Sequence, residues 1–161
     1  MDGRPIMRLL QFVFAASLVA VCTVPLFPAM KKWAVIAPTA SKLQDLSLTQ
    51  LAQFCKGSQK SWPDGKTFTL VIQDPDSPEM RPATLALFGV APEEAKAFIG
   101  KVNQSREVIK IVHSDEDLLR TVVATPGAVG LIDVYAINSS VKVLRIDGKL
   151  PFDTGYVLKS N

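Results

Sequence analysis

The sequence has few of the residues that most often carry catalysis or bind metals. Its 161 residues include two cysteines and one histidine. Cys22 lies in an apolar N-terminal run, so Cys55 alone remains for the folded part and no internal disulfide is expected. His113 has no nucleophile or metal-ligand partner at a recognised spacing. We therefore expect a protein that is not an enzyme and that holds neither a metal nor a cofactor.

The sequence also lacks the motifs of common hydrolases and nucleotide-binding loops. It contains no glycine-rich phosphate loop, no nucleophile elbow, no His-Glu-x-x-His and no Cys-x-x-Cys. A large excess of charge is missing too, because sixteen basic residues stand against fourteen acidic ones from Met30 onward. No cluster of lysine and arginine is interleaved with aromatic residues. We therefore do not expect nucleic acid as a partner.

The N-terminus carries a targeting pattern. Arg4 and Arg8 precede a run without charged residues, from Leu9 to Met30, and Lys31-Lys32 follows it. Prolines near the end of the run favour a cleaved signal peptide, whereas its length is nearly that of a membrane span, so residues 1–30 are predicted to be a signal peptide or a retained anchor. Either alternative places residues 31–161 in a periplasmic or extracytoplasmic location, with membrane contact only through the N-terminal segment.

Apolar residues are abundant, at 48% of the chain, and one stretch shows their spacing most clearly. Ser114 is a typical helix cap, and the acids at 115–117 favour the first turn of a helix. Apolar residues then recur at helical spacing over 118–123, before Pro126-Gly127 ends the helix. The apolar run 128–134 predicts a buried strand. A helix followed by a buried strand is half of a βαβ unit, which predicts an α/β domain.

The rest of the chain from residue 31 to 161 fits one such domain. A helix is expected from the Ser47 cap, with Gln50 at the capping-box position, to Gly57. Two more helices are expected at about 79–88 and 92–102, and four more strands at 33–37, 67–72, 108–112 and 141–146. The tail from Phe152 to Leu158 is expected to form a short strand or a packed loop. The predicted fold is a central mixed sheet flanked by helices.

Four motifs in order resemble a known family. They are Leu48-x-x-Leu51 leading into Phe54-Cys55-Lys56-Gly57, then Trp62-Pro63-Asp64-Gly65, then Ser114-Asp115-Glu116, and finally Pro126-Gly127-Ala128-Val129-Gly130. Together they resemble phosphate ABC transporter substrate-binding-like proteins, the short single-lobe members of the type 2 periplasmic binding protein family. The resemblance covers roughly residues 33–134. It implies one lobe of a periplasmic-binding-protein-like fold.

The resemblance also implies binding of phosphate or another small anion by helix N-termini and hydroxyl groups. The candidate ligand-binding residues are Ser47, Thr49, Ser77, Arg81 and Ser114. Each serine at a helix start has an alternative role as a cap, and Arg81 has an alternative role as a solvated side chain in a first turn. Both alternatives stay open for these residues.

The chain departs from the family pattern at the expected phosphate loop. The family has an arginine and then Ser-Gly-Thr there, whereas this chain has Gln73-Asp-Pro-Asp-Ser-Pro-Glu-Met-Arg81, with three acids that would repel a dianion. Two functions follow from this departure. One is a solute-binding-like protein with weak or lost anion binding. The other is a non-catalytic interaction module of the cell envelope, which docks on an envelope protein or on a second copy of itself.

Overall fold

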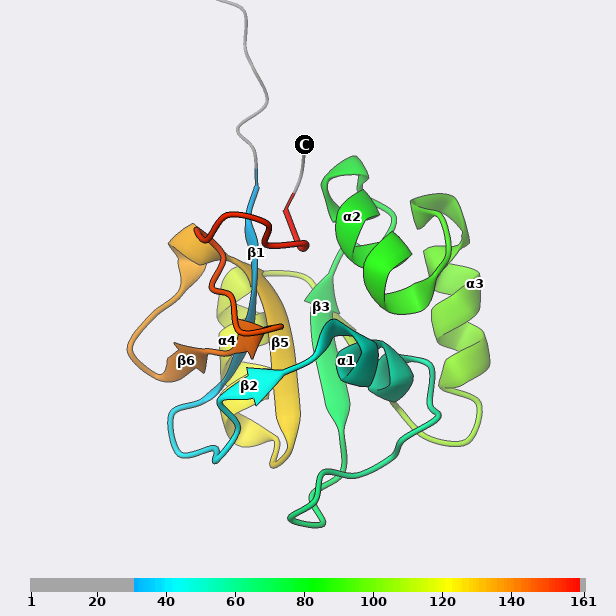
Figure 1. Cartoon of the computed structure of the whole chain (residues 1–161). Helices are drawn as coiled ribbons and strands as arrows, with labels where there is room; N and C mark the ends of the chain where they lie inside the picture. Colours follow the sequence, from blue (N-terminus) through cyan, green and yellow to red (C-terminus); the bar gives the residue numbers. More distant parts are fainter. Residues whose placement is uncertain (1–30, 160–161) are drawn as a thin grey trace, which may run out of the picture.

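A five-stranded mixed sheet forms the centre of the computed structural model, which describes residues 31–159 (Figure 1). The predicted signal or anchor, residues 1–30, lies outside the described residues. The strand order is β4-β3-β5-β1-β6. These strands are β1 (Trp33–Pro38), β3 (Thr69–Gln73), β4 (Ile109–Val112), β5 (Ala128–Asp133) and β6 (Val141–Val143). β3 pairs parallel with β4 and β5, and β1 pairs antiparallel with β5 and β6.

Helices cover both faces of this sheet. α1 (Leu48–Cys55) and α3 (Pro92–Val102) pack on one face and α4 (Asp115–Ala124) on the other (Figure 1). The alternation along β1 explains why two layers are needed. Ala34 and Ile36 join the cluster beneath α4, Val35 and Ala37 join the opposite cluster, and all four are fully buried. The predicted α/β fold with a mixed sheet between helices is confirmed.

The predicted unit around Ser114 is also confirmed. α4 connects β4 to β5, and both of these strands lie beside β3 and parallel to it. Ser114 caps α4, because its Oγ accepts a hydrogen bond from the Asp117 amide at 3.1 Å. Ser47 caps α1 in the predicted capping box with Gln50. Cys55 is fully buried, as expected for the apolar face of α1.

The segment predicted as one helix over 79–88 is irregular. It consists of the 3-10 turn η1 (Pro78–Met80), the short α2 (Arg81–Ala83) and the π-helical η2 (Thr84–Phe88). Pro82 has no amide hydrogen to donate, so the regular helical bonding pattern cannot pass through it. The segment ends at Gly89, whose amide donates to the Thr84 and Leu85 carbonyl oxygens, each at 3.1 Å.

Within residues 31–159, no helix has the length and apolar character needed to cross a bilayer.

The strand predicted over 141–146 is divided between two sheets. β6 pairs with β1, whereas β7 (Arg145–Ile146) pairs with β2 (Asp45–Leu46), a strand that the sequence did not predict. Leu144 lies between them and still donates to the Val35 carbonyl at 2.8 Å. The tail is a packed loop, held where the Tyr156 hydroxyl donates to the Trp33 carbonyl at 2.8 Å. Beside Trp33, η3 (Val134–Ala136) follows β5.

Gly130 allows α4 to lie directly on β5. A Cβ at this position would be 2.7 Å from Leu118 Cδ2 and 2.8 Å from Val122 Cγ2. We expect Gly130→Ala to lower the free energy of unfolding by about 1–3 kcal/mol through overpacking. Gly100 in α3 has open space around it, so Gly100→Ala should raise that free energy by about 0.5–1 kcal/mol. Denaturant unfolding measures both, and equal effects would contradict this packing.

Candidate anion-binding site

Three of the five predicted site residues lie at one end of the sheet. Ser77 and Arg81 follow β3, and Ser114 follows β4. Because β3 and β4 are parallel, the segments after them leave the sheet at the same end. A hydrogen bond joins these segments, since Gln73 Nε2 donates to Asp115 Oδ1 at 2.7 Å. We call this region the carboxyl edge.

Ser47 and Thr49 come from a different part of the fold. They begin α1, which follows β2 in the small second sheet. The Leu48 amide between them donates to Asp147 Oδ1 at 3.1 Å. The Ser47 hydroxyl is occupied locally, because its Oγ accepts from the Gln50 amide at 3.0 Å and donates to Gln50 Oε1 at 3.2 Å. Capping therefore accounts for Ser47 in the structure.

Ser77 differs from the two capping serines. Its side chain makes no capping hydrogen bond to η1, although its amide donates to the Asp74 carbonyl at 3.0 Å. Ser77 is half-buried in the loop that follows β3. Its hydroxyl is therefore available to donate to a ligand. Ser114 also keeps its hydroxyl hydrogen for a ligand, because its Oγ only accepts from the Asp117 amide.

Two cations beside the loop after β3 are already paired with carboxylates. Arg81 Nη2 lies 3.2 Å from Glu93 Oε1, and Lys96 Nζ lies 2.6 Å from Asp76 Oδ2. The hydrogen bond from Lys96 lowers the pKa of the Asp76 carboxyl, and the same bond raises the pKa of Lys96. An anion that approaches either cation would compete with a carboxylate that is already bound to it.

Several carboxylates lie around the same loop. Asp74, Asp76 and Glu79 lie in or next to the loop after β3, and Asp115 begins α4. Asp74 has a positive φ of 32°. It begins a turn in which its carbonyl accepts a hydrogen bond from the Ser77 amide. His113 is exposed between β4 and α4. In residues 31–159 no group of three or more histidine, cysteine or acidic side chains is placed to hold a metal.

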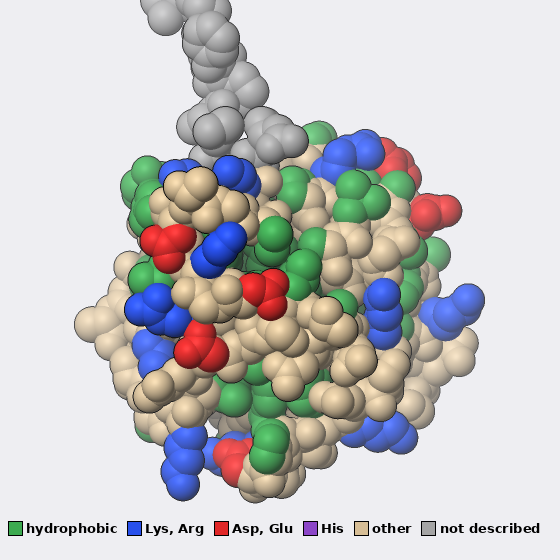
Figure 2. All heavy atoms as spheres, viewed as in Figure 1, with side chains coloured by type: hydrophobic (Ala, Val, Ile, Leu, Met, Phe, Trp, Pro, Cys, Tyr) green, Lys and Arg blue, Asp and Glu red, His purple; other side chains and the backbone are tan. Residues whose placement is uncertain are grey.

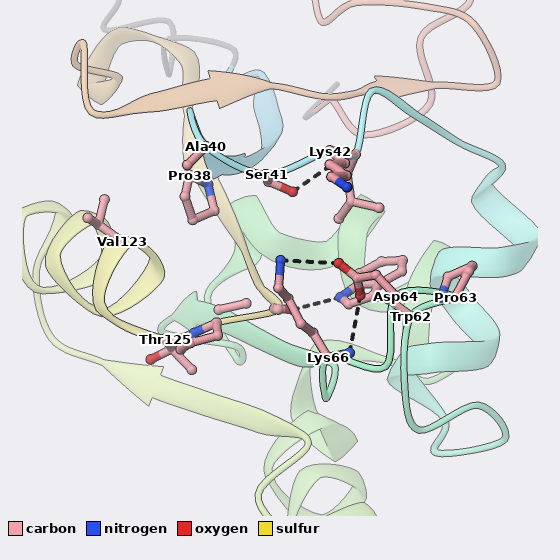
Figure 3. A pocket seen from close by; sticks show the side chains of 14 residues that line it. Pro38, Ala40, Ser41, Lys42, Trp62, Pro63, Asp64, Lys66, Val123 and Thr125 are labelled. Atoms are coloured by element: carbon pink, nitrogen blue, oxygen red, sulfur yellow. Dashed lines mark hydrogen bonds and ion pairs between the residues drawn. The ribbon is translucent and has the colours of Figure 1, made fainter.

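A pocket of about 540 Å³ lies at the opposite end of the sheet (Figure 3). Trp62-Pro63-Asp64 and Pro126-Gly127 line it, together with Pro38, Leu43 and Val123. The two motifs touch, because Trp62 Nε1 donates to the Gly127 carbonyl at 2.8 Å. Lys66 extends across the pocket to Asp64, with Nζ and Oδ2 3.1 Å apart. Trp62 itself is buried.

Sequence reasoning missed this pocket because its two motifs are far apart in the chain. A signal was present, since each motif is a turn that precedes a predicted strand. β3 and β5 pair in parallel, with Thr69 opposite Ala128, and the turns that precede parallel neighbours start from the same end of the sheet. Only the strand order, which the sequence did not provide, brings the turns together.

Comparisons with known proteins point in one direction. No family model matches the chain. Over 69 residues it is 38% identical to the phosphate-binding protein PstS 2 of Streptococcus agalactiae serotype V, a segment that is 43% of this chain and 23% of that protein. An ABC-type phosphate transport receptor from Vibrio cholerae superposes with a TM-score of 0.63 at 19% identity, covering 81% of this chain and 54% of the receptor. PstS from Borrelia burgdorferi gives a TM-score of 0.59 at 14% identity, covering 82% and 55%.

The fold is therefore that of one α/β lobe of a periplasmic binding protein. More specifically, the chain is related to the phosphate-binding proteins of ABC importers, as its ordered motifs predicted. It spans less than a quarter of the length of the Streptococcus relative and about half of the solved receptors.

Substitution of the serines separates capping from ligand binding. We expect Ser114→Ala to lower the free energy of unfolding by about 1 kcal/mol, because the Asp117 amide loses its partner. Ser77→Ala should change it by less than about 0.5 kcal/mol, because Ser77 makes no capping bond. Urea unfolding in buffer without phosphate or sulfate measures both. A loss at Ser77 as large as that at Ser114 would mean that Ser77 has a structural role.

Proposed function

We propose that this lobe is a solute-binding-like unit that holds a small anion such as phosphate weakly, at the carboxyl edge. Ser77, Arg81 and the start of α4 would supply the donors. The observation that supports weak binding is the pairing of the two cations beside the loop after β3, Arg81 with Glu93 and Lys96 with Asp76. The similarity to phosphate-binding proteins supports phosphate as the class of ligand, and it supports a role in binding and not in catalysis.

Electrostatics explain why the affinity would be low. A unit charge at about 4 Å from another contributes about 1 kcal/mol in water and more where solvent is partly excluded. A phosphate dianion at this edge meets repulsion of that order from Asp74 and Asp76. It also competes with the Asp76 carboxylate for Lys96. The Ser-Gly-Thr that the resemblance implies would add three neutral donors without added negative charge, and the chain has none at this loop.

We also propose that residues 1–30 direct export, as a signal peptide or as an anchor, and that residues 31–161 act outside the cytoplasmic membrane. The charge pattern of the N-terminus supports this proposal, with Arg4 and Arg8 before the uncharged run and Lys31-Lys32 after it. The named function of the relatives in phosphate transport agrees with it.

Thermal unfolding against phosphate tests the anion site. We expect 10 mM phosphate, at constant ionic strength, to raise the Tm of the wild-type chain by less than about 2 °C. Asp76→Asn should enlarge this shift, because it removes a repelling charge and frees Lys96. Sulfate and chloride at the same ionic strength identify effects that are not specific to phosphate.

The control is Glu107→Gln, which makes the same change of charge just before β4, at the far end of the strands. It should leave the phosphate shift unchanged. Equal shifts in the two variants would mean that phosphate responds to net charge alone. No shift in the wild type or in Asp76→Asn would favour the second function, an envelope interaction module without a ligand.

The pocket at the opposite end supports a second candidate, the binding of a small apolar anion. Its wall is largely apolar, its volume lies in the range of ligand sites, and Lys42 lines it together with Lys66, which is paired with Asp64. We expect the aromatic sulfonate anilinonaphthalene sulfonate to bind there. Val123→Glu should weaken this binding roughly tenfold, about 1.4 kcal/mol, by placing a like charge at the rim.

Leu85→Glu is the matched control for this pocket. Leu85 and Val123 are similarly exposed, at 49% and 47%, and only Val123 lines the pocket. Dye fluorescence titration measures both variants. Equal weakening would show that the dye binds elsewhere or responds to net charge.

A further inference from the structure

Two exposed aromatic side chains form a patch with three lysines. Tyr135 is 81% exposed and Phe152 is 62% exposed, and their ring centroids are 6.4 Å apart in an edge-on arrangement. Lys32 Nζ lies 4.4 Å from the centroid of the Phe152 ring. Lys32 also forms a β-bridge with Lys159, and Lys31 precedes it in the chain. We call these five residues the aromatic–lysine patch.

The patch is unusual because its aromatic rings serve no role in the core. Tyr135 lies in η3 and Phe152 in the tail, and neither belongs to the two clusters of buried residues. Large aromatic side chains exposed to this extent are costly in water, and when they are grouped they mark interaction surfaces. In Figure 2, basic and hydrophobic side chains lie side by side at the upper end of this face.

The position of the patch in the chain indicates what covers it. β1 begins at Trp33, directly after Lys31 and Lys32, so the uncharged run from Leu9 to Met30 reaches the domain at this patch. A bilayer into which that run inserts therefore lies next to the patch. Lysines following an apolar segment, with aromatic rings beside them, are typical of the membrane–water interface.

The charge of the patch agrees with an anionic surface. No ion pair engages Lys31, Lys32 or Lys159 within the part of the chain that the structure describes. The two nearest acids in sequence keep their negative charge and pair with none of these lysines: Asp133 Oδ1 accepts the Tyr135 amide at 3.1 Å, and Asp153 Oδ2 accepts the Leu150 amide at 2.8 Å. The ammonium groups are therefore available to phospholipid headgroups.

From these observations we propose that the aromatic–lysine patch docks on the surface of a bilayer containing anionic phospholipid. The rings of Tyr135 and Phe152 enter the headgroup region, and the lysines contact phosphate groups around them. The patch and the carboxyl edge lie at the same end of the sheet, since β1 starts where β5 ends, with Trp33 opposite Asp133. The proposal does not depend on anion binding by that edge.

A fluorescent label on the full chain tests this docking. A Cys22→Ser background leaves Cys55, which is buried and has a raised thiol pKa, so a cysteine placed at the surface takes the label. An environment-sensitive nitrobenzoxadiazole label is attached at Phe152→Cys or, as a control, at Val123→Cys. Val123 is exposed at the other end of α4 from Ser114, next to the pocket.

The chain is reconstituted in vesicles of phosphatidylethanolamine and phosphatidylglycerol, with or without brominated acyl chains. We expect brominated lipid to reduce the emission of the label at 152 by roughly twofold or more, and to leave the label at 123 nearly unchanged. Lys31→Gln with Lys32→Gln should reduce the quenching at 152, and so should replacement of phosphatidylglycerol by phosphatidylcholine. The label at 123 measures how much quenching tethering through residues 9–30 would cause by itself.

Two results would overturn the proposal. Equal quenching at 152 and 123 would mean that the domain has no preferred face toward the lipid. The label at 152 could instead be shielded from water equally with and without lipid, and lose that shielding when the protein is diluted. This result would identify a second copy of the chain, and not lipid, as what covers the patch. Circular dichroism of each variant, compared with the unlabelled chain, confirms that the surface changes have not altered the fold.

Discussion

Parallel pairing of β3 with both β4 and β5 is the constraint that decides where each candidate site lies. Leu70 lies opposite Ile109 on one side and Val129 on the other, so the three strands start at one end of the sheet and finish at the other. Segments that follow the strands therefore gather at the carboxyl edge, and turns that precede them form the pocket. The antiparallel β1 begins at the carboxyl edge, which puts the aromatic–lysine patch there.

The chemistry of the edge can change without loss of the fold, because the core and the edge use different residues. The sheet is held by apolar side chains, and Thr84 is the one polar residue buried among residues 31–159. Arg81, Asp76 and Lys96 are exposed, and exposed ion pairs contribute little to stability. A lobe related to phosphate-binding proteins can therefore keep its fold while carboxylates form ion pairs with the cations beside the loop after β3. This separation explains how motifs of the fold persist beside a loop without Ser-Gly-Thr.

Local patterns in the sequence predicted the elements that depend on local forces. The caps at Ser47 and Ser114, the burial of Cys55 and the four strands β1, β3, β4 and β5 follow from hydroxyl chemistry and apolar spacing, and the structure confirms them. Features that depend on distant partners were not predicted. β2 exists because β7 pairs with it, the break near Leu144 follows from the change of partner, and the pairs Arg81–Glu93 and Lys96–Asp76 require α3 to lie beside the loop. The pocket depends in the same way on the strand order.

Weak anion binding at the carboxyl edge is best tested by following amide chemical shifts during a phosphate titration. We expect shifts confined to residues 74–81 and 113–117, in fast exchange and saturating only at millimolar phosphate, a Kd that corresponds to about −4 kcal/mol. Slow exchange with saturation at micromolar phosphate would contradict it, because paired cations could not then limit the affinity. Shifts centred on Lys42 and Lys66 would also contradict it, by placing the anion at the opposite end of the sheet.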